Sequence, residues 1–333
     1  MSSNILKKLK QVENKLEEVD TNFTEQVNKI FDAYEQVRMN LRTRMQRGPV
    51  DNDKTPTQTT KSGIGKIRVG RILHNRQKGK KMFAVTDGYT NIVVTSHNKS
   101  KLGHSLSPYI LADEKGRLME NIWQFSKIYP QVAQQKQKTW THDAEVHVLN
   151  YKKLGYLDQS KITPDYWKWR AKGINHKHPV RYPNGYGGKE KCICALWSAK
   201  NNILAELDDI EDEYAEMEQL DYIEARKRIY VPLYIKLAKQ NAEFAELRKK
   251  LENGENLQIL DVDGPDDTIY EKNGKIPAPY DTMTQGIHGV TSEVGSIEIT
   301  EENIKLLLND PTQPFGHGYC LAVTLLEKEE WLN

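Results

Sequence analysis

The N-terminal forty or so residues carry an apolar repeat that constrains the fold of this chain more than any other feature. Apolar side chains recur at alternating steps of four and three residues, with one extra four-residue step around Phe23. The repeat consists of Ile5, Leu9, Val12, Leu16, Val19, Phe23, Val27, Ile30, Tyr34, Val37 and Leu41. So narrow a stripe predicts a coiled-coil helix over residues 1–47, the alternative being an amphipathic helix packed on its own chain. We expect a homo-oligomer joined through residues 5–41, and the mixed seam does not decide between a dimer and a trimer.

The rest of the chain divides at a polar segment. Gly48 and Pro49 end the helix, and residues 48–62 are rich in Thr, Asp, Asn, Gln and Pro with nothing to bury, which indicates a linker. Residues 63–333 are predicted to form one α+β globular domain. It is expected to be mainly helical, with a small basic β-hairpin or sheet over residues 63–104.

The segment between Lys61 and Lys101 contains ten Lys or Arg residues and a single acid, Asp87. Its short runs alternate polar and apolar residues, as strands with one buried face do. Two interpretations stay open: a basic hairpin that binds nucleic-acid phosphates through residues 61–101, or a solvated strand face. Over the whole chain, 48 basic and 46 acidic residues give a net charge of +2, which argues against a surface committed to a polyanion.

Cysteine content and hydropathy limit the cellular compartments in which the protein is expected. Three cysteines are too few, and odd in number, for a disulfide framework. No run approaches 18 consecutive apolar residues, so no membrane partner is expected. We expect a cytoplasmic protein, in a host cytoplasm or a virion if the source is viral.

Helical signals dominate the second half of the chain. A long helix is predicted over Tyr222–Glu252, with Pro232 kinking or dividing it. Residues 261–293 are interrupted by Gly and Pro and are expected to form a loop. Two shorter helices follow, at Thr300–Leu308 and from Phe315 to about Glu327.

The segment Met119–Lys127 gathers chemically active side chains. On a helix, four of its residues fall at i, i+3, i+4 and i+7 and share one face: Glu120, Trp123, Gln124 and Lys127. A carboxylate, an aromatic ring, an amide and a cation together are unusual for a face that only meets solvent. The alternative is an ordinary Glu-to-Lys helix pairing beside a half-buried Trp.

This spacing of Glu, Gln and Lys resembles the signature helix of the NADAR family. Members of that family include N-glycosidases that act on ribosylated amino-pyrimidines and on ADP-ribosylated guanine. The resemblance covers residues 105–327 and includes the later segments Leu257–Gly264 and Phe315–Leu326. Asn121 stands where the family usually has His, and a Gly-Pro pair replaces its Trp-Gly pair.

The resemblance implies roles in cleaving an N-glycosidic bond of a ribosylated nucleotide or an ADP-ribose-type small molecule. Glu120 would stabilise the oxocarbenium-like state or activate water, and Asp263 would supply a second catalytic carboxylate. Substrate contacts would come from Trp123, Gln124, Lys127 and Asp261, by stacking, hydrogen bonding and charge. The alternative for the two aspartates is a turn in which they accept backbone N–H groups.

Trp169 and Arg170 are assigned to substrate binding on composition. They close the run Tyr166–Arg170, in which aromatic planes lie next to an Arg, a combination that stacks bases and grips phosphates. The edge of an aromatic core has the same composition, so both interpretations stay open.

Neither a metal site nor a cofactor is predicted. Cys192 and Cys194 are separated by a single residue and have no second pair, which does not match zinc-ligand spacing. The acids of Asp261–Asp267 lack the positions of an EF-hand loop. No P-loop, nucleophile elbow or dinucleotide fingerprint appears.

Three functions follow from these patterns. The leading hypothesis is an N-glycosidase-like hydrolase of a ribosylated base or an ADP-ribose adduct, carried on an oligomerising stalk. The rival is a non-catalytic assembly protein, such as a virion or scaffold component, in which the coiled coil is the functional part. The third is a nucleic-acid-binding module.

Overall fold

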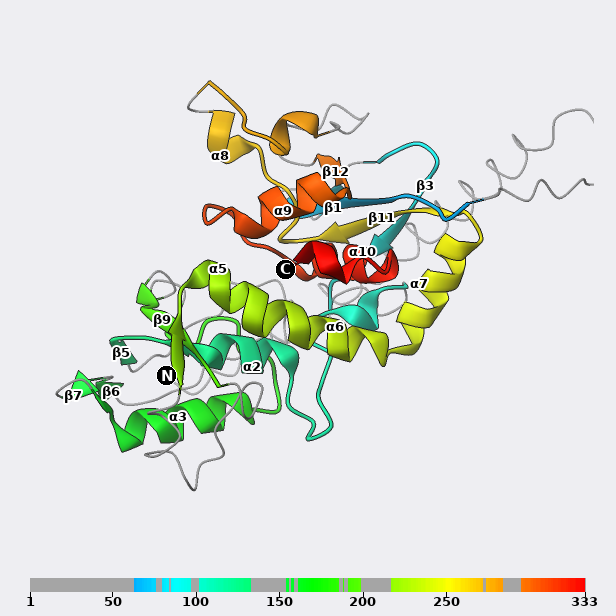
Figure 1. Ribbon diagram of the computed structural model, residues 1–333. Helices are drawn as coiled ribbons and strands as arrows, with labels where there is room; N and C mark the ends of the chain where they lie inside the picture. The colour runs from blue at the N-terminus through cyan, green and yellow to red at the C-terminus, as the bar shows by residue number, and fades with distance from the viewer. Residues whose placement is uncertain are drawn as a thin grey trace, which may run out of the picture. The chain divides into compact units, whose positions relative to one another are not determined.

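The computed structural model describes most of one compact unit that spans Lys61–Asn333 (Figure 1). The described residues are 63–75, 80–83, 85–96, 102–132, 154–155, 157–158, 161–185, 188, 191–198, 217–271, 274–283 and 295–332. The predicted coiled coil of residues 1–47 and the linker of residues 48–62 lie outside them. Among the described helices, none combines the length and the apolar composition that crossing a membrane requires.

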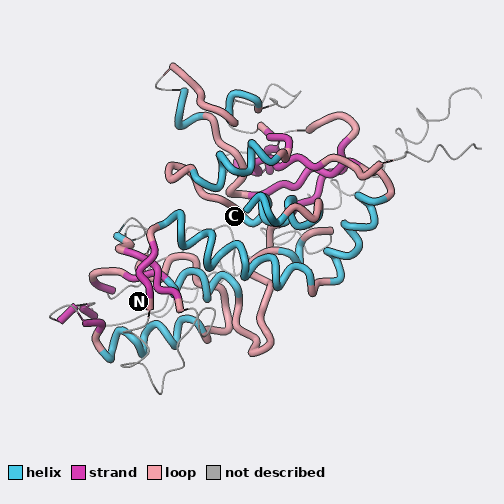
Figure 2. The backbone as a smooth tube through the Cα atoms, in the orientation of Figure 1, coloured by secondary structure: helices cyan, strands magenta, loops and turns pink. Residues whose placement is uncertain are grey.

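A five-stranded mixed sheet forms one side of this unit (Figure 2). Its order is β12-β1-β11-β3, and β2 pairs with β1. The bounds are β1 Ile67–Asn75, β2 Lys80–Phe83, β3 Tyr89–Val93, β11 Asn256–Asp261 and β12 Ser296–Glu298. Strand β11 runs parallel to β1 and β3, whereas β2 and β12 run antiparallel to β1. The predicted α+β class is confirmed, but the sheet is larger than a basic hairpin because β11 and β12 come from the C-terminal half.

Helix α10 (His317–Leu325) lies at the centre of the packing. All nine of its residues are buried. It packs on β1 and β11 and also on α6 (Val231–Lys239) and α7 (Ala242–Glu252); Figure 1 shows it between the sheet and α6. A helix covered on every side has to be apolar nearly all round, which explains the run Leu321–Leu325.

The helix predicted over Tyr222–Glu252 is present as four helical segments, of which the first three are continuous. Helix α5 (Tyr222–Ala225), a π-helical turn (Arg226–Tyr230) and α6 follow one another without a break. Pro232 is the second residue of α6 and has no N–H to donate, yet the chain stays helical from the π turn into α6. The division falls instead at Asn241, whose side chain caps α7 by accepting from the Glu243 N–H at 2.9 Å.

A buried cation ties the π turn to the end of α9 (Glu301–Asn309). Arg226 is 1% exposed. Its guanidinium donates to the backbone carbonyls of Leu307, Leu308, Asp310 and Gln313 at 3.4, 3.1, 2.9 and 2.8 Å. The last carbonyls of a helix have no partner within it, so Arg226 satisfies acceptors that would otherwise be buried without a hydrogen bond.

A second group of elements lies on the side of α6 away from the sheet (Figure 1). Helices α2 (Met119–Ser126) and α3 (Pro164–Ile174) pack together so closely that a Cβ on Gly173 would overlap the ring of Phe125. A three-stranded sheet joins them, with β4 Lys127–Ile128, β9 Cys194–Trp197 and β10 Glu218–Leu220. The short pairs are β5 Gln131–Val132 with β6 Leu154–Gly155, and β7 Leu157–Asp158 with β8 Lys161–Ile162.

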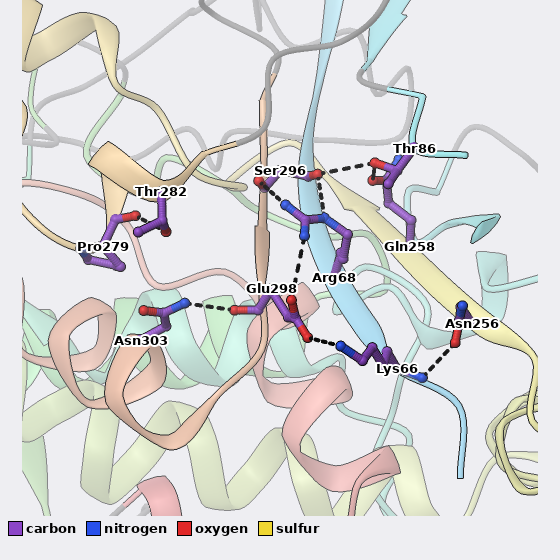
Figure 3. Close-up of polar contacts among 10 residues, drawn as sticks. All are labelled: Lys66, Arg68, Thr86, Asn256, Gln258, Pro279, Thr282, Ser296, Glu298 and Asn303. Carbon is purple, nitrogen blue, oxygen red and sulfur yellow. Dashed lines mark hydrogen bonds and ion pairs between the residues drawn. The ribbon is translucent and has the colours of Figure 1, made fainter. Parts of the chain in front are cut away.

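Arg68 of β1 is buried, and its guanidinium is hydrogen-bonded to a residue of β12 (Figure 3). Its Nε donates to the Ser296 hydroxyl at 3.0 Å and its Nη2 to the Ser296 carbonyl at 2.7 Å. The Glu298 carboxylate lies 3.0 Å from Lys66 Nζ and 3.9 Å from Arg68 Nη1. Arg71 of the same strand pairs with Asp266, so among the described residues three of the ten basic side chains of this segment are paired with an acid of the same domain.

The two C-terminal helices are present where they were predicted. Thr300 caps α9 by accepting from the Asn303 N–H at 3.2 Å, and α10 follows. The predicted loop of residues 261–293 contains a short helix, α8 (Thr268–Glu271), and a 3-10 turn at Tyr280–Thr282, while residues 284–294 lie outside the described part.

Replacing Arg226 tests the buried cap. Arg226→Met should lower the free energy of unfolding by about 3 kcal/mol, because it leaves several buried carbonyls without a donor. Arg228→Met is the matched control on the same π turn: Arg228 pairs with Glu218 at the surface, and its loss should cost about 1 kcal/mol or less. Urea titration measures both, and equal losses would contradict the capping role.

Candidate functional site

Three of the predicted polar side chains form one connected chain of contacts, but only Glu120 and Gln124 lie on α2, because the helix ends at Ser126 and Lys127 is the first residue of β4. Gln124 Nε2 donates to Glu120 Oε1 at 3.0 Å, and Lys127 Nζ donates to Gln124 Oε1 at 2.9 Å. Glu120 lies in the first turn of the helix and is 7% exposed. Its carboxylate is therefore held inside the protein, and the structure brings all three side chains together.

Trp123 forms an apolar wall beside this chain of contacts. It is 9% exposed and belongs to the main hydrophobic core. The Lys127 ammonium lies 4.5 Å from the centre of its ring, and the Tyr230 ring centroid lies 5.1 Å away. The indole is thus already engaged by protein groups, which makes it a support for Lys127 rather than an open platform for stacking a base.

Asn121 determines which segment lies next to Glu120. The side chain is fully buried, and its Nδ2 donates to the carbonyls of His176 at 2.8 Å and His178 at 3.1 Å. Its Oδ1 accepts from the Val180 N–H at 2.7 Å. These three hydrogen bonds fasten the loop after α3 to α2, and the next residue of that loop is Arg181.

Arg181 is a site residue that sequence analysis missed. Its Nη2 lies 3.9 Å from Asp263 Oδ1. Burial alone would lower the pKa of this guanidinium, but the neighbouring Tyr109, Asp263 and Glu120 raise it overall. Arg181 therefore connects the carboxylate of α2 with the turn that follows β11, and no periodic signal in the sequence marks it.

Four charged groups consequently meet, and we call Glu120, Lys127, Arg181 and Asp263 the four-charge cluster. Burial raises the pKa of Glu120, Arg181 and Lys127 oppose that effect, Asp263 adds to it, and the resulting pKa is about 7. Burial also lowers the pKa of Lys127, against the charges of Glu120 and Asp263. A carboxyl group that titrates near neutral pH is suited to accepting and returning a proton.

Asp261 lies beneath the cluster rather than in it. It is 1% exposed, and its carboxylate accepts from the N–H groups of Asp263 at 3.2 Å and Gly318 at 2.8 Å. Burial raises the pKa of this carboxyl, and the adjacent His317 opposes the shift. Asp261 was predicted to contact substrate. The structure instead favours the alternative, a turn in which its carboxylate accepts hydrogen bonds from backbone N–H groups.

His317 fixes Asp261 from the other side. Its Nε2 lies 2.7 Å from the Val94 carbonyl, which can only accept, so Nε2 bears a hydrogen. Its Nδ1 lies 3.2 Å from Asp261 Oδ2. The two side chains are therefore in direct contact in the buried interior.

Two glycines make this arrangement sterically feasible. A Cβ on Gly316 would come within 2.9 Å of the Asp263 Cβ and closer still to the Asp261 carboxylate. A Cβ on Gly264 would lie 2.6 Å from the Gly70 carbonyl. Gly264 thus allows a close approach of backbone to backbone, and Gly316 leaves room for the side chains of the two aspartates.

Trp169 and Arg170 are not part of the four-charge cluster. Trp169 is fully buried, with its ring centroid 5.0 Å from Phe125 and 5.1 Å from Tyr166. Arg170 is 3% exposed and its Nε donates to the Phe125 carbonyl; burial lowers the pKa of this guanidinium to about 10. Both residues pack α3 on α2, which matches the core-edge alternative and corrects their assignment to substrate.

The described residues contain no group of three or more His, Cys, Asp or Glu side chains arranged to hold a metal ion. Cys192, Cys194 and Cys320 are free thiols.

The chain matches no protein-family model, no curated protein and no solved structure. The four-charge cluster is therefore the feature from which we infer its function.

The raised pKa of Glu120 predicts a specific pH dependence of stability. The folded protein binds this proton more tightly than the unfolded chain, so the stabilisation is complete below about pH 4.5 and is lost as pH rises through 7. Glu120→Gln removes that dependence. Between pH 5 and pH 8 the variant should gain up to about 3 kcal/mol relative to wild type in urea unfolding.

Glu301→Gln is the control for that measurement. Glu301 also lies in the first turn of a helix and pairs with a residue four positions on, Lys305, but its side chain is 55% exposed. It shows what the loss of an exposed helix carboxylate does in the same measurement. A difference for Glu120→Gln that does not vary with pH would mean that the Glu120 carboxyl is not buried in the folded protein.

Proposed function

We propose that this domain hydrolyses the N-glycosidic bond of a ribosylated base or an ADP-ribose adduct. The observation that carries the proposal is a buried carboxyl group with a pKa of about 7, close to a second carboxylate and two cations. Perturbed carboxyl groups of this kind concentrate at catalytic sites. A carboxylate pair is also the usual equipment for cleaving a glycosidic bond.

The reaction can be assigned to the cluster step by step. The C1–N bond breaks with its electron pair passing to the base nitrogen, and positive charge develops on the ribose ring. Asp263 stabilises that charge, while Glu120 takes a proton from the water whose oxygen bonds to C1. Glu120 then returns the proton to the departing base, so the carboxylate is restored.

Arg181 and Lys127 are suited to the anionic part of the substrate. The Arg181 contact with Asp263, at 3.9 Å, is longer than a hydrogen bond, and within the described part of the chain no group accepts a hydrogen bond from its guanidinium. A planar guanidinium with donors to spare binds phosphate in a bidentate manner. The pyrophosphate of an ADP-ribose group fits that requirement.

The proposal agrees with the resemblance of residues 105–327 to the NADAR family. The residues that carry the resemblance, Glu120, Gln124 and Lys127, are joined by hydrogen bonds, and Asp263 lies within range of their charges. Assembly through residues 5–41 and a cytoplasmic location complete the proposal. A non-catalytic assembly role and nucleic-acid binding through residues 61–101 remain its rivals.

Turnover assays test the proposal directly. The full-length protein is incubated with ADP-ribosylated guanosine and with a ribosylated amino-pyrimidine, and the released base is quantified by chromatography. Glu120→Gln should reduce the rate at least 100-fold, because it removes the group that moves the proton. Asp263→Asn should reduce it by a similar factor.

Glu301→Gln again serves as control and should retain full activity. Urea unfolding of Glu120→Gln at the pH of the assay shows whether a loss of activity comes from loss of fold. Two results would contradict the proposal: no base released by the wild type from either compound, or equal rates for wild type and Glu120→Gln.

A further inference from the structure

Gln124 connects Glu120 and Lys127, two oppositely charged members of the four-charge cluster. Gln124 and Glu120 belong to α2, whereas Lys127 is the first residue of β4. The amide makes one hydrogen bond on each side: Nε2 donates to Glu120 Oε1 at 3.0 Å, and Oε1 accepts from Lys127 Nζ at 2.9 Å. The family resemblance implied that this amide contacts substrate, but in the structure each of its ends is engaged by a protein group.

Lys127 determines which way round this amide lies. An ammonium group has only donors, so the atom of Gln124 that faces it has to be the carbonyl oxygen, and the NH2 group then faces Glu120. Lys127 is itself held on two sides. Its backbone pairs with Ala195 of β9, and its ammonium lies 4.5 Å from the centre of the Trp123 ring. The orientation of the amide therefore follows from the strand that begins where α2 ends.

An amide in this orientation makes the two oxygens of Glu120 unequal. Oε1 faces an N–H donor, so it presents a lone pair whether the carboxyl group is ionised or protonated. A proton on Oε1 would place a hydroxyl group, which is a poorer acceptor than a carbonyl oxygen, against that donor. When Glu120 is protonated, its proton is therefore on Oε2.

The charges around Glu120 make this difference relevant at neutral pH. Burial raises the pKa of the carboxyl, while Arg181, the hydrogen bond from Gln124 and the charge of Lys127 lower it. Asp263 raises it again, and the resulting pKa is about 7. Both protonation states are thus populated near neutral pH, and the position of the proton decides which oxygen can exchange it.

We propose that Gln124 is a positioning residue which, oriented by Lys127, keeps Oε1 of Glu120 as a hydrogen-bond acceptor and so assigns proton transfer to Oε2. This inference rests on the proposed N-glycosidase function. Oε2 takes the proton from the water whose oxygen bonds to C1, while the electron pair of the C1–N bond passes to the base nitrogen. The same oxygen then returns the proton to that nitrogen. Gln124 acts through Glu120 and makes no contact with substrate.

The titration of Glu120 tests the hydrogen bond without any substrate. Its carboxyl carbon is followed by ¹³C NMR in the full-length protein. Gln124→Met keeps the length of the side chain but has no N–H, so the midpoint should rise by about one pH unit, the effect of one hydrogen bond to a charged group. Gln219→Met is the control on an exposed glutamine of β10 and should leave the midpoint near 7.

A double substitution tests whether Lys127 orients the amide. Lys127→Met should raise the midpoint by itself, because the lost charge favours the ionised carboxylate. It also allows the amide to turn, so that Gln124 can donate to the ionised form or accept from the protonated form of Glu120. Adding Gln124→Met to Lys127→Met should therefore shift the midpoint by much less than one pH unit. Equal shifts in the two backgrounds would overturn the orienting role of Lys127.

The turnover assay separates a positioning role from a substrate contact. Gln124→Met should lower kcat about tenfold, leave KM within twofold of wild type and move the pH profile of kcat upwards together with the NMR midpoint. A higher KM with an unchanged midpoint would mean that Gln124 contacts substrate, in which case the positioning role is wrong and the proposed function stands.

Failure of the proposed function gives a different result. If wild type releases no base, the catalytic role of Gln124 fails with the proposed function, whereas the NMR midpoint still shows whether Gln124 holds Oε1. Urea unfolding of each variant shows whether any loss of activity comes from loss of fold.

Discussion

The hydrogen bonds that Asp261 makes at the N-terminus of α10 are the interaction on which the rest of this structure depends. Helix α10 is buried along its whole length, so its first N–H groups need an acceptor inside the protein. Asp261 supplies it through Gly318, and His317 holds the carboxylate in place. The same carboxylate accepts from the Asp263 N–H and thereby fixes the turn that presents Asp263 to the cluster. The Asp261 carboxylate therefore fixes both the start of the buried helix α10 and the position of Asp263.

The four-charge cluster places the Glu120 carboxylate in an environment that is unfavourable for its charge. Enclosing Glu120 disfavours its ionised form, and Arg181 and Lys127 offset only part of that effect, which is why the carboxyl titrates near neutral pH. A residue chosen for stability alone would be apolar or fully paired. Retaining a partly compensated carboxyl beside a second one is more readily understood as a requirement of chemistry.

Sequence reasoning found the parts of the site that depend on local periodicity. The pairing of Glu120 with Gln124 follows from helical spacing, whereas Lys127 lies just past the end of α2, in β4, and still reaches Gln124. Arg181 escaped because its position depends on tertiary hydrogen bonds from Asn121 to a distant loop.

The error over Trp169 and Arg170 has a different cause. Composition indicated a binding surface, but Tyr166, Trp169, Arg170 and Gly173 lie at i, i+3, i+4 and i+7 of α3 and are buried together. That spacing is the mark of a core-facing stripe, and it would have favoured the packing interpretation. The sheet was also underestimated, since the pairing of β11 and β12 with β1 depends on long-range contacts that no local pattern encodes.

The central claim is that Glu120 is buried within the electrostatic reach of Asp263, and a titration of its carboxyl carbon by ¹³C NMR tests this most directly. The resonance is assigned by its absence from the spectrum of Glu120→Gln. We predict a midpoint near pH 7 in the wild type and a lower midpoint in Asp263→Asn, because the Asp263 charge raises the pKa of Glu120. A midpoint near 4.5 that does not move in Asp263→Asn would contradict the account.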